Sequence, residues 1–419
     1  MNRVILFLSI MDFTDKGIQV VKLTPEYFAK NGWSVHYAVA RDNSENGSYH
    51  YQDAISPPGV AVHRTTMPSC WLGEGLRNHV LKTIYSKLRG YAAIVKLSWI
   101  GYHVIGRNAI DVIYGGGPHG VLAAIILNIL YARRRLITIS RFYGVWDLYS
   151  RNIAEHRWFK LLLNFDVLAA LYLRTNLKII TNDGTQGNKA LGWIRPKSLD
   201  TLRFYVNGTD KLSIIDADSL ALRRSLSADD DIFTVVCVTR LVSIKRIDRC
   251  IEVAASVVHR FGMNDFRMII VGDGPERIRF EKLAVDLGVR DNIVFTGAVD
   301  NGRVKNYLAI SDAFLSMYDV SNVGNPLLEA IRANKVIFTL NNGDTSNWIQ
   351  HGVNGFIYDV DDSVIDRIAQ DMNALAYNSA LRDSIKRNIR VTELEKLWTW
   401  DERLQAEFSE VEKLVEGRS

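Results

Sequence analysis

Residues 234–271 read TVVCVTRLVSIKRIDRCIEVAASVVHRFGMNDFRMIIV. The stretch begins with the apolar run Thr234–Val238, which is typical of a short buried strand. Apolar side chains then recur at helical spacing over residues 251–258, and a second apolar run follows at Met268–Val271. A strand, a helix and a strand in this order, with the strands apolar throughout, predict a parallel sheet covered by helices on both faces.

The same alternation continues through the second half of the chain and returns, less regularly, in the first half. The further strands that we expect are Arg3–Ser9, Ser34–Ala40, Asp111–Tyr114, Leu136–Ser140, Lys178–Thr181, Ile293–Thr296, Ala313–Ser316, Val336–Leu340 and Gly355–Tyr358. A polar stretch within 205–231 separates the two sets. We therefore predict an α/β fold of two Rossmann-like, doubly wound parallel-sheet domains, 1–206 and 207–399. A ligand site is expected in a cleft where the carboxyl ends of their strands face each other.

The C-terminal segment is amphipathic and carries Trp398 and Trp400 near its start. Its pattern fits two arrangements equally well. A helix over 400–419 either crosses back to cap the first domain or lies on the surface and closes the second.

Composition places the chain among globular proteins. It has 419 residues, of which 47% are hydrophobic and 23% charged, and this excludes disordered and fibrous classes. Its three cysteines are too few and too scattered for a disulfide framework or a metal-binding pair, which favours a reducing, cytoplasmic environment. No stretch reaches the roughly 20 apolar residues that a membrane-spanning helix needs.

Charge is distributed unevenly between the predicted domains. Residues 1–206 contain 25 Lys and Arg against 13 Asp and Glu, whereas residues 207–419 contain 26 against 33. Within 77–107 there are six basic residues, no acidic residue and several aromatic ones. This segment either binds an anionic membrane peripherally, at the inner face of the cell membrane, or packs on its own domain with a solvated charged face. No helix-turn-helix, zinc or RNA-binding motif points to nucleic acid.

Basic residues follow the first strand of the second domain. Arg240 and Lys245 stand between that strand and the next helix, where strand ends and helix N-termini favour anions. Together they can neutralise a diphosphate as fixed charges without a divalent metal. The alternative for this segment taken alone is a solvated basic loop.

A second strand-to-helix junction lies at Ser321–Ala330 and reads SNVGNPLLEA. Gly324 allows a ligand to approach the backbone, and exposed N–H groups around Asn325 can hold anionic or sugar oxygens. One turn on, the Glu329 carboxylate can accept two hydrogen bonds from a vicinal diol. The alternative is that Glu329 faces solvent or pairs with Arg332.

The first half has a glycine-rich loop at Gly115–Gly117, where a ligand could lie against the backbone. The loop follows an expected strand and precedes an apolar helix. His119 would lie in the first turn of that helix, pointing toward the cleft; otherwise it is a loop histidine with no role. Gly17, after the first strand, is a second place where a ligand can approach the backbone closely.

Five motifs in register carry a resemblance to a known family. They are Arg240-Leu241-x-x-x-Lys245-x-x-Asp248, Val271-Gly272-Asp273-Gly274-Pro275-Glu276-Arg277, Asn292-Ile293-Val294-Phe295-Thr296-Gly297, Gly324-x-x-x-x-Glu329-Ala330 and His351-Gly352-Val353-Asn354-Gly355-Phe356. In order and spacing, residues 234–360 resemble the donor domain of the retaining GT-B-fold glycosyltransferases of family 4. The first half resembles that family only in outline.

The resemblance implies roles for individual residues. Arg240 and Lys245 would hold the donor diphosphate, Glu329 the ribose hydroxyls, and the backbone from Gly297 to Val299 would face the base. Family members have a histidine at the place of His119, near the reacting sugar and phosphate. They also have a second glutamate, eight positions before the ribose glutamate, that contacts the transferred sugar. Here Ser321 stands in its place, and Asp319 or Asn325 is a candidate to supply the missing contact.

The expected activity is that of a retaining, metal-independent hexosyltransferase. The resemblance implies a UDP- or GDP-type nucleotide sugar as co-substrate, no other cofactor, and a glycan or lipid-linked acceptor in polysaccharide or glycolipid synthesis. Two alternatives remain open at this point. One is a non-catalytic nucleotide-sugar-binding scaffold, suggested by Ser321, and the other is a sugar-nucleotide epimerase on the same fold.

Overall fold

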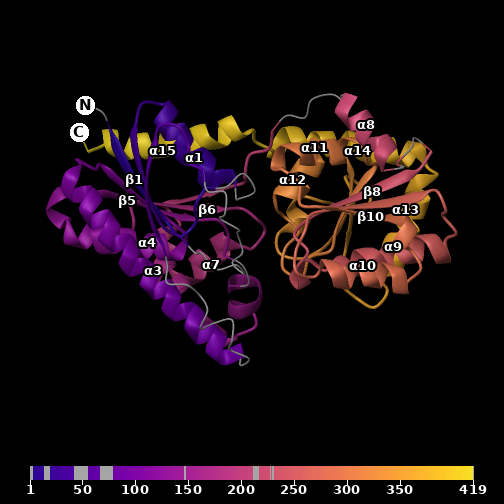
Figure 1. Ribbon diagram of the computed structural model, residues 1–419, viewed down its shortest axis with the longest axis horizontal. Helices are drawn as coiled ribbons and strands as arrows, with labels where there is room; N and C mark the ends of the chain where they lie inside the picture. The colour runs from indigo at the N-terminus through magenta and orange to yellow at the C-terminus, as the bar shows by residue number, and fades with distance from the viewer. Residues whose placement is uncertain are drawn as a thin grey trace. The chain divides into compact units, whose positions relative to one another are not determined.

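The computed structural model describes residues 3–13, 19–41, 55–66, 79–145, 148–210, 217–226, 228 and 231–418. Gly17, a predicted site residue, lies outside them. The chain divides into two compact units (Figure 1). The first consists of Met1–Asn182, Gly187–Tyr205 and Asp401–Ser419, and the second of Asp183–Gln186 and Val206–Trp400.

The first unit is built on a seven-stranded parallel sheet of order β3-β2-β1-β4-β5-β6-β7. Its strands are β1 (Val4–Ser9), β2 (Ser34–Arg41), β3 (Val60–Thr66), β4 (Val112–Gly116), β5 (Ile137–Phe142), β6 (Leu177–Thr181) and β7 (Leu202–Tyr205). The order reverses between β1 and β4, as in a doubly wound fold. The expected first strand is confirmed as β1, which lies in the interior of this sheet with five of its six residues buried.

Helices cover both faces of this sheet. They are α1 (Gln19–Lys30), α3 (His79–Arg107), α4 (Gly117–Leu130), α5 (Trp158–Leu163), α6 (Phe165–Tyr172), α7 (Gly187–Ile194) and α15 (Trp400–Glu416). One buried cluster includes side chains of β1, α1 and α15, and another joins β1 and β2 to α3 and α4. Both faces of the strands are therefore buried, which explains why the strands are apolar throughout.

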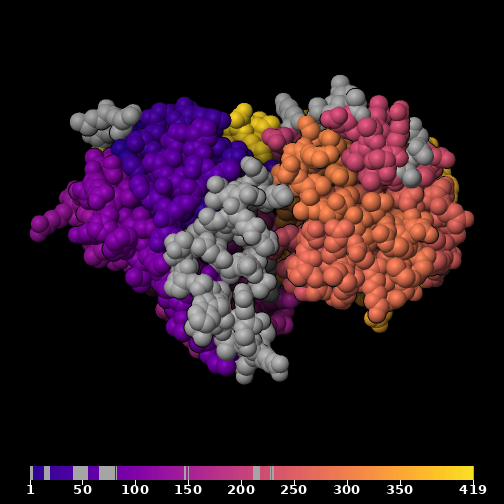
Figure 2. Space-filling view, viewed as in Figure 1, coloured from indigo at the N-terminus to yellow at the C-terminus, as the bar shows by residue number. Residues whose placement is uncertain are grey.

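The last helix, α15, belongs to the first unit from Asp401 onward. Its Phe408 ring meets the rings of Phe28 and Trp33 edge to face, and Glu412 pairs with Arg3. The yellow ribbon of α15 runs beside α1 in Figure 1, and part of it is visible at the surface in Figure 2. Of the two arrangements left open for 400–419, the structure has the one on the first domain.

The second unit has a six-stranded parallel sheet of order β10-β9-β8-β11-β12-β13. Its strands are β8 (Phe233–Val238), β9 (Phe266–Val271), β10 (Ile293–Gly297), β11 (Ala313–Ser316), β12 (Val336–Leu340) and β13 (Phe356–Tyr358). All six correspond to predicted strands. The helices are α8 (Ala217–Ser225), α9 (Ile247–Ala255), α10 (Arg277–Asp286), α11 (Asn301–Ala309), α12 (Asn325–Arg332), α13 (Val364–Ala376) and α14 (Ser379–Lys396). One large apolar cluster joins these strands and helices.

Each unit is thus a Rossmann-like parallel α/β domain, as predicted. In the second unit the order reverses between β8 and β11, so the loops that follow these two strands lie at the switch point where ligands of such sheets bind. These two loops carry Arg240 and Lys245, and Ser321 and Gly324, respectively.

Candidate functional site

Glycine packing shapes the loop after β8. A Cβ atom on Gly272 would lie 1.8 Å from the Thr239 carbonyl oxygen, and one on Gly274 would lie 2.4 Å from that of Leu241. Gly272 also has a φ of 141°, which favours glycine. The Gly-x-Gly motif at 272–274 therefore allows two loop backbones to pack closely, and so fixes the segment that carries Arg240.

Lys245 lies at the end of the same loop, in a short 3-10 turn over Ser243–Lys245. Burial and, to a smaller extent, the nearby Arg240 lower the pKa of Lys245 to about 8, and Asp183 opposes them. Arg240 itself is exposed. The structure thus brings the two predicted diphosphate ligands together, and an anion that binds both would relieve their repulsion.

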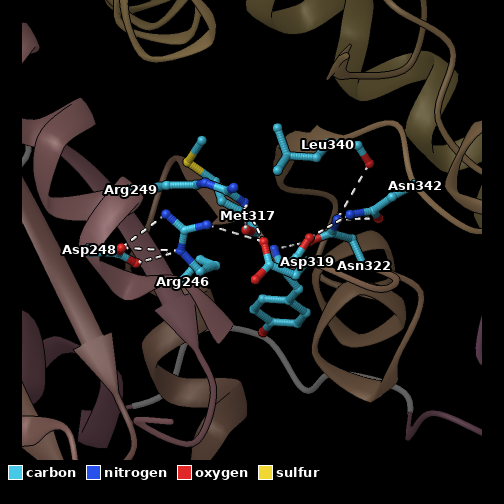
Figure 3. A network of polar contacts seen from close by, with 9 residues as sticks. Arg246, Asp248, Arg249, Met317, Asp319, Asn322, Leu340 and Asn342 are labelled. Carbon is cyan, nitrogen blue, oxygen red and sulfur yellow. Dashed lines mark hydrogen bonds and ion pairs between the residues drawn. The ribbon is translucent and has the colours of Figure 1, made fainter. Parts of the chain in front are cut away.

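An ion-pair network fixes the loop after β11 (Figure 3). Arg246, at the start of α9, pairs with the Asp248 carboxylate at 3.1 Å and with that of Asp319 at 3.2 Å. Arg249 reaches the same Asp319 oxygen at 2.9 Å. Since two arginines hold Asp319, its carboxylate is engaged within the protein, although it was a candidate for the missing sugar contact.

Asparagine side chains complete this network. The Asn322 amide oxygen accepts from the Tyr318 N–H at 3.0 Å, and its nitrogen donates to the Asn342 oxygen at 2.7 Å (Figure 3). Asn342 in turn donates to the Tyr318 carbonyl. These contacts hold residues 318–322 in one shape just before α12.

The N-terminus of α12 lies next along the chain. Pro326 occupies the first turn, as expected, and Gly324 is the N-cap. The φ of Gly324 is −164°, which any residue can adopt, but the position of its missing Cβ is open, with the nearest atom at 3.8 Å. The Asn325 side-chain oxygen accepts from Asn207 at 2.7 Å. Open space and helix N–H groups therefore meet at Gly324, which suits an oxygen-rich ligand.

Glu329 is one turn further along α12. Burial raises its pKa to about 8, with Asp210 adding to the effect. The sequence left open a pairing with Arg332, but Arg332 pairs with Glu393 at 2.9 Å and donates to the Thr209 hydroxyl at 3.0 Å. Within the described part of the chain, no ion pair or hydrogen bond engages the Glu329 carboxylate. A carboxylate in this position is suited to accept hydrogen bonds from a ligand.

Ser321 makes contacts that the sequence did not suggest. Its hydroxyl donates to the Asp183 carbonyl oxygen at 3.0 Å and accepts from the Val323 N–H at 3.1 Å. Asp183 begins the segment Asp183–Gln186, which follows β6 in sequence and packs within the second unit. Ser321 therefore anchors this segment.

The predicted base-facing backbone follows β10. Gly297 has a φ of 76° and its carbonyl accepts from the Gly272 N–H at 3.0 Å. Val299 is partly buried against the apolar core. Gly297 is thereby linked to the glycine loop that supports Arg240.

His119 belongs to the first unit and lies in the first turn of α4, as predicted. Its Nε2 lies 3.6 Å from the Asp166 carboxylate on α6, and Lys87 on α3 pairs with Asp166 at 2.7 Å. Burial lowers the pKa of His119, Asp166 raises it and Lys87 lowers it, with a net decrease. When the ring is neutral and its proton is on Nε2, on the side of Asp166, Nδ1 is an acceptor. This Nδ1 is buried and has no hydrogen-bond partner within the described part of the chain.

Sequence reasoning missed Asp166 and Asp183. Asp166 carries no local signal, because its partners come from other helices. Asp183 directly follows the expected strand Lys178–Thr181 and precedes Gly184, a placement that would have identified it as a strand-end residue. Over the described ranges, no group of three or more His, Cys, Asp or Glu residues is arranged to hold a metal ion.

The chain is similar to known proteins both in sequence and in structure. The model of the family "Glycosyl transferases group 1" matches residues 218–392. A GDP-mannose-dependent alpha-(1-6)-phosphatidylinositol monomannoside mannosyltransferase of Mycobacterium tuberculosis is 27% identical over 311 residues, which are 71% of this chain and 74% of the relative. An alpha-monoglucosyldiacylglycerol synthase of Acholeplasma laidlawii is 26% identical over 41% of this chain and 42% of its own.

Two solved structures share the fold. HepE of Anabaena, in complex with UDP and glucose, has a TM-score of 0.70 at 16% identity and covers 98% of this chain and 100% of its own. Sucrose-phosphate synthase of Thermosynechococcus elongatus has a TM-score of 0.73 at 15% identity and covers all of both chains. These likenesses show the GT-B fold. The chain is therefore a glycosyltransferase with the GT-B fold, and its residues 218–392 match the model of the glycosyl transferases group 1 family.

Proposed function

We propose that the chain transfers a hexose from a UDP- or GDP-sugar to a lipid-linked or glycan acceptor at the cytoplasmic face of a membrane. Transfer is metal-independent and retains the anomeric configuration, as in family 4. The observation that carries the donor half of the proposal is the unpaired Glu329 carboxylate in the unit that brings Arg240 and Lys245 together.

The chemistry needs little from the protein beyond placement and charge. In the proposed reaction the acceptor hydroxyl attacks the anomeric carbon from the face of the leaving group, and the departing diphosphate takes the proton. Arg240 and Lys245 stabilise the negative charge that grows on this diphosphate. Glu329 binds the ribose hydroxyls, and the His119 Nδ1 accepts a hydrogen bond from a hydroxyl of the transferred sugar.

The membrane half of the proposal rests on an apolar stripe along α3. The side chains Leu81, Ile84, Leu88, Tyr91, Val95, Trp99 and Tyr102 are all exposed and recur every three or four residues. The opposite side of the same helix, including Leu97 and Val104, is buried against the sheet. A helix that is apolar on both sides has an exposed side in need of an apolar partner.

Exposed apolar side chains also gather on the following helices of the first unit. Trp158, Phe159 and Leu162 on α5, and Phe165 on α6, are each at least 60% exposed. The ion pair between Lys87 and Asp166 joins α3 to α6, so the two exposed sets belong to connected helices.

The charge around these side chains favours a lipid surface. The described part of α3 contains Lys87, Arg89, Lys96 and Arg107 and no acidic residue. Aromatic and aliphatic side chains among cations are typical of surfaces that lie in the headgroup region of anionic membranes. Among the described helices, none is long and apolar enough to cross a membrane. By their names, one of the two relatives above is a phosphatidylinositol monomannoside mannosyltransferase and the other synthesises a glucosyldiacylglycerol, so both names include a lipid.

Vesicle sedimentation tests the membrane half. The chain should bind vesicles of phosphatidylglycerol and phosphatidylcholine, bind neutral vesicles more weakly and be released by salt. Replacing Leu88, Val95 and Trp99 with Ser should weaken this binding at least tenfold. The control is Ile278→Ser on α10, which is 82% exposed but belongs to the other unit. Equal binding to neutral and anionic vesicles would contradict the proposal.

A transfer assay tests the chemistry. UDP-glucose or GDP-mannose is supplied with a membrane lipid extract, with and without EDTA, and the product linkage is read by NMR. We expect an α-linked product from these α-linked donors at the same rate in EDTA. A β-linked product would contradict retention, and loss of activity in EDTA would contradict metal independence.

A further inference from the structure

Asp183 lies next to position 321, where the resemblance leads us to expect a glutamate and this chain has serine. Ser321 occupies the place of the second glutamate, and its hydroxyl donates to the Asp183 carbonyl oxygen at 3.0 Å. The same Asp183 interacts electrostatically with Lys245. An acidic residue from a different loop thus contacts Ser321 through its backbone, and its carboxylate interacts with the predicted diphosphate ligand Lys245.

Close packing holds the Asp183–Gln186 segment against the loops after β11 and β12. The Asp344 N–H donates to the Gly184 carbonyl at 3.1 Å, and the Gln186 amide donates to the Asp344 carboxylate at 3.0 Å. A Cβ atom on Gly184 would lie 2.2 Å from the Ser321 hydroxyl, and one on Gly343 would lie 2.1 Å from the Gly184 carbonyl oxygen. The segment can approach this closely because both positions are glycine.

The size of residue 321 is part of this arrangement. The Ser321 Cβ lies 3.1 Å from the position of a Gly343 Cβ, and its hydroxyl contacts Asp183 and Val323. A glutamate at 321 would need the space that the Asp183–Gln186 segment fills. The small serine side chain therefore leaves room for the Asp183–Gln186 segment, and this segment carries the Asp183 carboxylate.

The Asp183 carboxylate is itself oriented. One oxygen accepts from the Thr185 N–H at 3.1 Å and from the Thr185 hydroxyl at 2.6 Å. Within the described part of the chain, no hydrogen bond from another residue engages the second oxygen. Burial raises the pKa of Asp183 to about 6, opposed by the Thr185 hydrogen bonds and by Lys245.

We propose that Asp183 supplies the acidic contact to the transferred sugar, in place of the glutamate absent at position 321. Its free oxygen accepts a hydrogen bond from a sugar hydroxyl of the donor while Lys245 binds the diphosphate. Asp183 is thus a residue that determines donor specificity. The inference rests on the proposed function, because it presumes that a nucleotide sugar binds beside Lys245.

The test compares ligands with and without the sugar. Thermal stabilisation is measured with UDP, GDP, UDP-glucose and GDP-mannose for the wild type, Asp183→Asn and a control, Asp286→Asn, at the exposed end of α10. Asparagine keeps an oxygen for Thr185, so the loop is preserved. In the wild type the nucleotide sugar should stabilise more than its nucleotide.

For Asp183→Asn we expect stabilisation by the nucleotide alone to be unchanged, and the extra stabilisation from the sugar to be lost. In the transfer assay kcat/KM should fall at least tenfold, whereas Asp286→Asn should match the wild type. If Asp183→Asn keeps the full extra stabilisation by the nucleotide sugar over the nucleotide, the inference is overturned and the proposed function stays intact. Failure of all four ligands to stabilise the wild type overturns the proposed function, and the inference with it.

Discussion

The ammonium nitrogen of Lys245 lies 3.7 Å from the centroid of the Tyr318 ring. The ring is fixed in turn, because its hydroxyl donates to the Val238 carbonyl at 3.0 Å, at the end of β8. A cation over an aromatic face keeps its position at low entropic cost. Lys245 is therefore pre-positioned, before any phosphate arrives, by a ring from the loop that follows the neighbouring strand, β11.

This placement predicts a pH dependence of donor binding. Since the pKa of Lys245 is lowered to about 8, the ammonium loses its proton as pH rises through 8, whereas a bound diphosphate favours the protonated form. Affinity for UDP or GDP, measured by calorimetry at constant ionic strength, should fall as pH rises from 7.5 to 9.5. Lys245→Arg should remove this fall, because arginine stays charged. Equal wild-type affinities at both pH values would contradict the prediction.

The pKa of Glu329 predicts a pH dependence of stability. Its pKa is raised to about 8 in the fold from an ordinary value of 4.5, so between these pH values the folded state holds a proton that the unfolded state has lost. Stability must then fall as pH rises from about 4.5 to 8. Glu329→Gln should be more stable than the wild type at pH 8.5, by about 1 to 3 kcal/mol, and the gap should close toward pH 5.

Measuring nucleotide affinity distinguishes a role of Glu329 in ribose binding from its effect on stability alone. Glu329→Gln should also bind UDP or GDP at least tenfold more weakly, because hydrogen bonds from the ribose hydroxyls favour ionisation of the carboxyl group, and an amide has a single acceptor oxygen and no charge. The matched control is Glu395→Gln, an exposed glutamate on α14, which should change neither property. A more stable variant with unchanged nucleotide affinity would show that Glu329 does not hold the ribose.

The strands could be predicted where burial on both faces makes them apolar throughout. Central strands such as β8 and β12 were recognised for this reason, whereas β3 and β7, at the edges of the first sheet, were missed. Their sequences, VAVHRTT and LRFY, mix charged and apolar residues, and every residue of β7 is only partly buried. An edge strand can lack a continuous apolar run, as β3 and β7 do, and sequence periodicity then does not identify it. The edge strands of the second sheet, β10 and β13, are apolar enough to be recognised.

The candidate site was predicted where its residues share a local motif. Arg240 and Lys245 lie on one loop, and Glu329 lies one turn into the helix that Gly324 begins. Asp183 could not be found in this way, because its relation to Ser321 depends on the close approach of two distant segments. Only the fold shows that the small residue at 321 and the acidic residue at 183 belong together.

Gly90 on α3 predicts a way to displace His119 without unfolding the protein. A Cβ atom at position 90 would lie 2.5 Å from the His119 Nε2, so Gly90→Ala forces the ring away from Asp166. Because the ring is the end of a side chain, stability should change by less than about 1 kcal/mol, with part of any cost offset by the helix propensity of alanine. Transfer activity should fall at least tenfold if His119 acts at Nδ1.

Gly106 provides the control on the same helix. A Cβ atom there meets only the Tyr131 hydroxyl at 3.6 Å, an ordinary contact. Gly106→Ala should therefore keep full activity and gain about 0.5 to 1 kcal/mol in stability. If Gly90→Ala is as active as Gly106→Ala, the position of His119 does not matter for transfer.

Glu407 and Arg403 on α15 form a buried cluster with Arg141 on β5. This cluster predicts that loss of its anion and loss of one of its cations change stability by different amounts. Glu407 is fully buried and lies 2.6 Å from Arg403 and 3.9 Å from Arg141, and the Tyr114 hydroxyl donates to it. Burial alone would raise its pKa, but the two arginines outweigh burial and lower it. Its stabilising effect is therefore fully present above about pH 4.5 and is lost as pH falls further.

Removing the single anion leaves two buried cations together, whereas removing one cation leaves a neutral pair. Glu407→Gln should lower the free energy of unfolding by about 3 to 5 kcal/mol at pH 7, and Arg403→Met should lower it less, since Arg141 and Tyr114 still meet Glu407. Lys413→Ala, on the exposed side of α15, should lie within about 0.5 kcal/mol of the wild type. Urea unfolding followed by circular dichroism measures all three. Equal losses for Glu407→Gln and Arg403→Met would mean that the buried cations do not repel each other, and that the cluster acts only as a set of pairwise contacts.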